Sequence, residues 1–229
     1  IKKKLNSSNI FFLEGIAYRS HPQIDFIVKL INKDEIGKII KIKSVFGFNS
    51  GKPNIKGRLF NKKLGGGSIL DLGCYPVSMS NLIANLNNNN ETLPKIKNIK
   101  GKIFETGVDT EAEANLEYEN GIISEIKVSV LENLENVTII TGTKGIIKIL
   151  DPWLPKKENI IELNKNGKII KLSTSSSLNL FANQIQLFEK IVKNRKLQND
   201  YHTMTVENSI NCMNVMMQWK DNLISDENC

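Results

Sequence analysis

The chain has 229 residues, of which 40% are hydrophobic and 24% are charged, and this composition excludes disordered and collagen-like proteins. A chain of this length buries roughly 70% of its unfolded surface, so it needs neither a disulfide nor a metal to fold. Its net charge is +7, but the basic residues are mostly scattered lysines, which argues against the clustered basic stripe of a nucleic-acid-binding protein.

No apolar run reaches the roughly 18 to 20 residues of a membrane-spanning helix, and residues 1–8 lack the apolar core of a secretory signal. We therefore expect a cytoplasmic protein without a membrane partner. Cys74, Cys212 and Cys229 are isolated from one another, which predicts reduced thiols and no metal site. The chain starts with Ile1 rather than Met, and we expect it to be the later part of a longer protein.

Residues 10–17 form a nearly continuous apolar run, typical of a strand buried on both faces of a parallel sheet. We interpret residues 1–17 as the remnant of a preceding dinucleotide-binding domain, with residues 18–229 forming the next domain. After His21-Pro22 a helix is expected, because apolar side chains recur on one helical face.

Residues 38–48 alternate lysine with apolar side chains, which predicts a strand with one wet face and antiparallel partners. Hairpin signals such as Asn120-Gly121 and Asn166-Gly167 separate further strands. These strands are expected at residues 95–104, 109–118, 122–130, 136–141, 145–150, 160–163 and 168–172. The asparagine tract at residues 87–90 is expected to be a surface loop.

Helical spacing of apolar residues predicts helices over residues 68–86, 178–192 and 205–219, with Pro76 either kinking the first of these or starting its second part. The expected apolar faces are formed by Phe181, Ile185, Phe188 and Val192 in the second helix, and by Ile210, Met213 and Met217 in the third. Strands followed by helices predict an α+β fold: a large, mostly antiparallel open sheet with helices packed on one face.

Asp71 and Tyr75 are spaced i and i+4 just after Gly65-Gly66-Gly67, so they project from the same face of a continuous helix. A phenol is a plausible proton donor or acceptor in alcohol–ketone interconversion. The alternative is an Asp that caps the helix and a Tyr that packs in the core. The glycine triplet could also hold an anion at a helix N-terminus, although its spacing matches neither a Walker nor a Rossmann motif.

Tyr18-Arg19-Ser20-His21 is a second polar cluster, at the carboxyl end of the expected strand, where open α/β sheets bind ligands. His21 is either part of that site or a structural hydrogen-bonding residue.

Together these segments resemble the Gfo/Idh/MocA oxidoreductase family over almost the whole chain. The matching stretches are residues 14–23, 36–39, 64–77, 109–112, 142–145 and 181–185. The stretch from Leu64 to Val77, with its Asp-x-Gly-x-x-Pro-like helix, is the most specific.

The resemblance implies a two-domain enzyme, with an N-terminal Rossmann domain that binds NAD or NADP and a C-terminal α+β domain of the glucose–fructose oxidoreductase type. It implies a sugar, polyol or cyclic diol as substrate and a homodimer or homotetramer formed through the open sheet face. Tyr75 stands where other branches have histidine, which resembles the branch of dihydrodiol and NADP-dependent xylose dehydrogenases.

In that branch Tyr75 and Asp71 are the expected catalytic residues, with Tyr75 as acid/base. Tyr18 and Arg19 are expected to bind the cofactor, and His21 and Arg58 to bind the substrate. These roles are implied by the resemblance alone.

The sequence contains neither the GxGxxG fingerprint nor the Glu-Lys-Pro motif whose lysine is catalytic in the family. Both are expected upstream, so this fragment alone is expected to be inactive. Two alternatives remain open: a stand-alone, non-catalytic module for sugar binding or dimerisation, and an inactive relative that binds sugar without redox chemistry.

Overall fold

A single eight-stranded sheet organises the computed structural model, which describes residues 2–8, 10–86, 92–194 and 202–226. The strand order is β2-β3-β4-β1-β5-β6-β7-β8. The strands are β1 (Ile39–Gly47), β2 (Lys95–Ile103), β3 (Asp109–Glu117), β4 (Ile123–Ser129), β5 (Val137–Gly142), β6 (Gly145–Leu150), β7 (Glu158–Lys165) and β8 (Lys168–Ser175). Neighbours pair antiparallel except β1 with β4, which are parallel. The mostly antiparallel sheet expected from the sequence is confirmed.

The sheet has one apolar and one polar face because its strands alternate side chains. In β3, Ala112, Ala114 and Leu116 are buried, whereas Glu113 and Asn115 between them are partly exposed. Successive side chains of a strand point to opposite faces. The inner face therefore carries the core, and the outer face carries charge.

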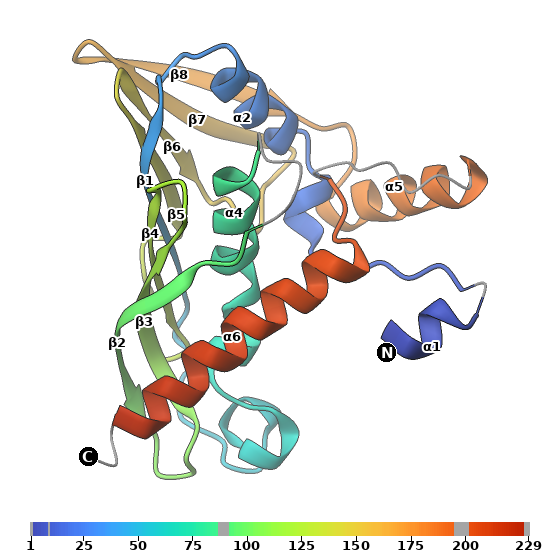
Figure 1. Cartoon of the computed structure of the whole chain (residues 1–229), viewed down its shortest axis with the longest axis vertical. Helices are drawn as coiled ribbons and strands as arrows, with labels where there is room; N and C mark the ends of the chain where they lie inside the picture. The colour runs from blue at the N-terminus through green and yellow to red at the C-terminus, as the bar shows by residue number, and fades with distance from the viewer. Residues whose placement is uncertain (1, 9, 87–91, 195–201, 227–229) are drawn as a thin grey trace.

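Helices cover the inner face only (Figure 1). The helices are α1 (Lys2–Asn6), α2 (Gln23–Asn32), α3 (Ser68–Leu72), α4 (Cys74–Ala84), α5 (Leu180–Asn194) and α6 (Val206–Asp226). Of these, α2, α3, α4 and α6 contact strands. The expected arrangement of helices on one face of the sheet is confirmed. None of the helices in the described ranges is both long and apolar enough to cross a membrane.

Helix α6 buries a different face from the one expected. Met213 and Met217 are partly exposed, whereas Cys212, Met216 and Trp219 are buried against the sheet side. The expectation was wrong because methionines occur on both sides of this helix. The buried tryptophan, the largest apolar side chain of the helix, determines which face packs.

Helix α5 forms as expected, but it packs on the short 3₁₀ turn η1 (Ala17–Ser20) rather than on the sheet. Its expected apolar face is exposed to solvent. Figure 1 shows α5 and the N-terminal segment on the side of the molecule away from the sheet.

Residues 10–17 do not form the expected strand. They make one isolated antiparallel bridge, between Glu14 and Met204, and η1 begins at Ala17. A strand needs a neighbouring strand to pair its backbone groups, and all the named strands in the described ranges lie in the eight-stranded sheet, away from residues 10–17. That residues 1–17 are the remnant of a preceding domain stays a prediction, and the expected loop at residues 87–90 lies outside the described residues.

A buried carboxylate holds the glycine triplet and the start of α3 in place. Asp109, at the beginning of β3, accepts hydrogen bonds from Ser68 Oγ at 2.7 Å and from the backbone N–H of Ile69 at 2.6 Å. Gly67 has φ +114°, and a Cβ there would lie 2.3 Å from Asp109 Oδ1. Only glycine fits at position 67, because both the backbone angle and the carboxylate exclude a side chain.

Gly67→Ala is expected to lower the free energy of unfolding by about 3 kcal/mol, because it adds a steric clash to an unfavourable backbone angle. Gly65→Ala is the matched control: Gly65 has φ +69°, but a Cβ there would have no atom within 4 Å, so the change should cost only about 1 to 2 kcal/mol. Urea unfolding of both variants measures the difference. Equal losses would show that the contact with Asp109 does not constrain this segment.

Candidate functional site

Tyr75 lies in the first turn of α4, directly after the junction with α3. Gly73 joins the two helices with helical dihedral angles (φ −60°, ψ −26°), and its carbonyl accepts a hydrogen bond from the N–H of Val77 at 3.1 Å. Pro76 is therefore in the first turn of a new helical segment, where its missing N–H costs nothing. Of the two possibilities considered for Pro76, the structure shows the second: it starts the second part of the helix.

Three aromatic rings surround the Tyr75 ring. Phe46 of β1 contacts it edge-to-face at a centroid distance of 5.0 Å, Trp153 at 6.1 Å and Tyr18 at 6.2 Å. Trp153 is itself fixed, because its Nε1–H donates to the carbonyl of Val45 at 2.8 Å. Such packing holds an aromatic ring in one orientation.

The hydroxyl of Tyr75 is available for chemistry. Within the described part of the chain it makes no hydrogen bond, and the residue is only half-buried. Burial raises the pKa of this phenol above its ordinary value, and the neighbouring Cys74 and Asp71 raise it further. At neutral pH Tyr75 is therefore a neutral phenol.

Asp71 pairs with Arg58 rather than with Tyr75. The Arg58 guanidinium donates from Nη2 to Asp71 Oδ1, and the carboxylate is more buried than the guanidinium. This ion pair joins the loop before the glycine triplet to α3. The structure thus brings Asp71, Arg58 and Tyr75 into one region, with Asp71 held by a cation and close enough to Tyr75 to affect its pKa.

Tyr18 and Arg19 are buried within the domain. The Tyr18 hydroxyl shares a hydrogen bond of 2.8 Å with Ser78 Oγ, and Arg19 donates to the carbonyls of Ser78 and Thr203. Burial raises the pKa of Tyr18 to about 12. The Tyr18 ring, held by these contacts, packs against the ring of Tyr75. A direct contact of Tyr18 or Arg19 with a cofactor stays a prediction.

His21 has both ring nitrogens engaged within the protein. Its Nδ1 accepts from the N–H of Gln23 at 3.2 Å, and its Nε2 lies 3.1 Å from the carbonyl of Lys156. Burial lowers the pKa of this imidazole, which favours the neutral ring with Nε2–H as donor. This arrangement favours the structural alternative, and a substrate contact of His21 stays an untested prediction.

The glycine triplet is not a free anion site. The carboxylate of Asp109 already takes the N–H of Ile69 at the N-terminus of α3, where a phosphate would otherwise bind. The glycine triplet therefore does not offer this N–H to a phosphate. In the described ranges no cluster of three His, Cys, Asp or Glu side chains could hold a metal ion.

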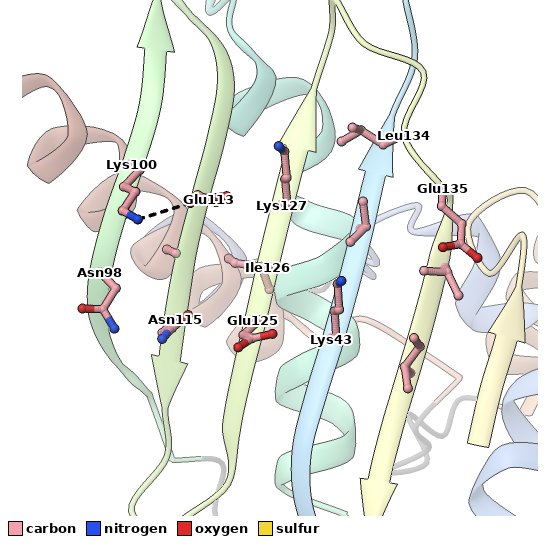
Figure 2. Close-up of a pocket in the computed structure, with 14 residues that line it drawn as sticks. Lys43, Asn98, Lys100, Glu113, Asn115, Glu125, Ile126, Lys127, Leu134 and Glu135 are labelled. Atoms are coloured by element: carbon pink, nitrogen blue, oxygen red, sulfur yellow. Dashed lines mark ion pairs between the residues drawn. The ribbon is translucent and has the colours of Figure 1, made fainter. Parts of the chain in front are cut away.

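A separate hollow of about 540 Å³ lies on the outer face of the sheet, on the side opposite α4. Figure 2 shows Lys43, Glu125 and Lys127 standing on neighbouring strands at its floor, with Glu135 at its side. Charges of both signs alternate there. This hollow does not include any of the residues expected to be catalytic.

Sequence reasoning missed the residues that position Tyr75. Phe46 lies within an expected strand, but nothing in the sequence connected Phe46, Trp153 or Ser78 with Tyr75. Asp109 begins a strand in which acidic and apolar side chains alternate, so its sequence context does not distinguish it from Glu111 or Glu113. A buried carboxylate needs hydrogen-bond donors, but the sequence does not say that the donors are 40 residues away.

Comparison with known proteins gives the family. The model described as GFO/IDH/MocA C-terminal domain matches residues 25–148, more than half of the chain. The trans-1,2-dihydrobenzene-1,2-diol dehydrogenase of Xenopus tropicalis is 29% identical over 185 residues, covering 78% of this chain and 54% of the relative. The protein of the same name from Xenopus laevis is 31% identical over 172 residues, covering 75% of this chain and 49% of the relative.

Solved structures show the same fold. The 3-ketoreductase KijD10 of Actinomadura kijaniata, in complex with NADP and TDP-benzene, has a TM-score of 0.78 at 16% identity, covering 91% of this chain and 61% of that one. The aldose-aldose oxidoreductase of Caulobacter crescentus, complexed with glycerol, has a TM-score of 0.78 at 15% identity, covering 94% and 62%. The chain spans about half the length of the curated relatives it matches. It belongs to the GFO/IDH/MocA family and contains that family's C-terminal domain.

Proposed function

We propose that this chain is the substrate-binding half of a nicotinamide-dependent oxidoreductase acting on a sugar, polyol or cyclic diol, and that Tyr75 transfers the proton. The observation that carries the proposal is the half-buried Tyr75, with a packed ring and a hydroxyl that has no hydrogen-bond partner among the residues that the structure describes. Relatives named as diol dehydrogenases, and a related fold in complex with NADP, support the reaction class.

In the reductive direction Tyr75 donates its phenolic proton to the carbonyl oxygen of the substrate, and in the oxidative direction the phenolate takes the proton of the alcohol. When bound, a nicotinamide would supply the hydride to the carbonyl carbon, or accept it from the carbinol carbon in the reverse direction. The buried surroundings of Tyr75 keep the phenol protonated. A cation from outside the described residues would therefore be needed to favour the phenolate.

The Asp71–Arg58 ion pair is proposed to form hydrogen bonds with the substrate hydroxyls. Arg58 is largely exposed while its partner carboxylate is mostly buried, so the guanidinium has donors left for a ligand. Tyr18 and Arg19 are proposed to support the nicotinamide side of the site through Ser78 and Tyr75.

Tyr75→Phe is expected to lower kcat by about 10²-fold or more, since it removes the proton donor and keeps the ring. The measurement is reduction of NADP⁺ or NAD⁺ by trans-1,2-dihydrobenzene-1,2-diol and by aldoses, with the protein expressed from its native gene. Tyr118→Phe is the matched control, because it removes another buried tyrosine hydroxyl, which donates to Asn81 at 2.7 Å. The control should keep its kcat.

An unchanged kcat in Tyr75→Phe would remove Tyr75 from the mechanism. A native protein with no oxidoreductase activity that still binds sugars would favour the non-catalytic module instead.

Tyr75 in the 229-residue chain is expected to ionise only above pH 10, the ordinary value for tyrosine, because burial and neighbouring acidic groups favour the neutral form. Ultraviolet difference titration of the wild type against Tyr75→Phe isolates this phenol. A midpoint below pH 10 would mean that a cation within this chain already activates it.

The open sheet face is proposed to be covered by a second copy. Val137 and Ile139 lie in the hollow among Lys43, Glu125 and Lys127, a mixture of apolar and charged groups typical of interfaces between folded subunits. An eight-stranded sheet with one face bare is an obvious surface for self-association, since a copy would bring charges to pair with these.

Ile139→Glu is expected to convert a dimer or tetramer to monomers, because it adds an unpaired carboxylate to the centre of this face. Sedimentation velocity at several protein concentrations measures the change. Ile170→Glu, at an exposed position on the edge strand β8, is the control and should leave the assembly intact. A wild type that stays monomeric at all concentrations would contradict the proposal.

A further inference from the structure

The connection between β1 and α3 concentrates positive charge. Residues 36–70 are the longest stretch of the chain without an aspartate or a glutamate. The segment from residue 48 to residue 67, which joins β1 to α3, lies within this stretch. We call this segment the cationic loop. Its basic residues are Lys52, Lys56, Arg58, Lys62 and Lys63.

Most of these charges are not neutralised within the part of the chain that the structure describes. All five basic side chains of the cationic loop are exposed, and only Arg58 has an ion-pair partner there, the carboxylate of Asp71. On the sheet, by contrast, lysines pair with carboxylates of neighbouring strands, as in Lys102–Glu111. The four lysines of the cationic loop therefore create an unbalanced positive potential, which raises the local concentration of anions.

Packing and hydrogen bonds fix the backbone of the cationic loop. Phe60 is buried and contacts the ring of Phe104 edge-to-face at a centroid distance of 5.4 Å. The side chain of Asn61 accepts a hydrogen bond from the N–H of Lys63 at 3.0 Å, and its carbonyl accepts one from the N–H of Gly66 at 3.0 Å. Because the backbone is already ordered, less conformational freedom is lost when a ligand binds to the loop.

Arg58 connects the cationic loop with the candidate site. Its partner Asp71 lies one helical turn before Tyr75 and is close enough to affect the pKa of that phenol. The guanidinium donates from Nη2 to Asp71, which leaves further N–H groups as donors for a ligand. A ligand that contacts both Tyr75 and Arg58 would therefore bring its far end to the cationic loop.

The number of cations favours a phosphate ester over a carboxylate as the anionic group. A carboxylate carries a single negative charge, whereas a phosphate monoester carries roughly −1.5 to −2 at neutral pH. A guanidinium can bind two phosphate oxygens through parallel hydrogen bonds, and ammonium groups bind phosphate as point charges. One arginine with several lysines around it thus matches a doubly charged group with three acceptor oxygens.

We propose that the substrate is a phosphorylated sugar or polyol, whose phosphate is bound by Arg58 and the lysines of the cationic loop while its reacting carbon lies at Tyr75. This inference rests on the proposed function and narrows its substrate class. A neutral diol of similar size would gain nothing from the four lysines.

The test is calorimetric titration of the protein expressed from its native gene, kept saturated with its dinucleotide so that the phosphates of the cofactor do not compete. The probes are glucose, ribose and glycerol, each compared with glucose 6-phosphate, ribose 5-phosphate or glycerol 3-phosphate. At least one ester is expected to bind ~10-fold or more tightly than its parent at low salt, because the loop attracts only the charged ligand. Added salt should reduce this advantage, since exposed charges are screened.

Lys56→Gln combined with Lys63→Gln is expected to remove most of the advantage of the ester and to leave the affinity for the parent sugar unchanged. Lys168→Gln combined with Lys171→Gln is the matched control. It removes two exposed lysines from β8, which lies at the opposite end of the strand order from β2. The control should bind the ester as the wild type does.

The inference would be overturned if no ester bound, or if every ester bound no more tightly than its parent. An ester preference that survives in the Lys56 and Lys63 double variant would also overturn it, because the phosphate would then be bound elsewhere. Oxidation of neutral diols without any ester preference would contradict this inference and leave the proposed function standing. Lysine-dependent binding of an ester by a protein without oxidoreductase activity would support phosphate binding by the loop and contradict the proposed function.

Discussion

The buried carboxylate of Asp109 is the constraint on which the site depends. It takes the first free N–H of α3 and the Ser68 hydroxyl, and its other oxygen leaves no room for a side chain at Gly67. A buried charge without donors would be strongly destabilising, so the strand and the helix must meet in one way. The start of α3 then determines where α4 begins, and with it where Tyr75 stands.

The position of Tyr75 has two consequences that act in opposite directions. Packing against Phe46, Trp153 and Tyr18 fixes the ring, which favours catalysis by reducing the freedom that must be lost in the transition state. The same burial raises the pKa of the phenol, which keeps the group protonated at neutral pH and makes it a weaker acid. Any proton transfer from Tyr75 would therefore be helped by positive charge placed near its oxygen.

Much of the fold could be predicted from the sequence, because alternation along a strand is a local property. Eight of the nine expected strands form, residues 10–17 being the exception, and turns such as Asn166-Gly167 lie where expected. Properties that depend on distant partners could not be predicted. The inward face of α6 is determined by packing of Trp219, the contact of Asp109 with Ser68 spans 41 residues, and residues 10–17 lack a strand to pair with. Tyr75, Asp71 and Arg58 were found from the sequence, whereas the aromatic rings that hold Tyr75 were not.

Two surfaces of the domain, the outer face of the sheet and the exposed side of α5, differ in chemistry. The outer face of the sheet carries exposed ion pairs such as Lys41–Glu125 and Lys148–Glu135. Such pairs are stable in water and contribute little to the free energy of folding. That face can therefore be exposed to water at little cost in free energy. One side of α5 exposes the apolar side chains of Phe181, Ile185, Phe188 and Val192 instead, which water does not stabilise. The hydrophobic effect thus favours covering this side of α5, whereas it gives little reason to cover the charged parts of the sheet.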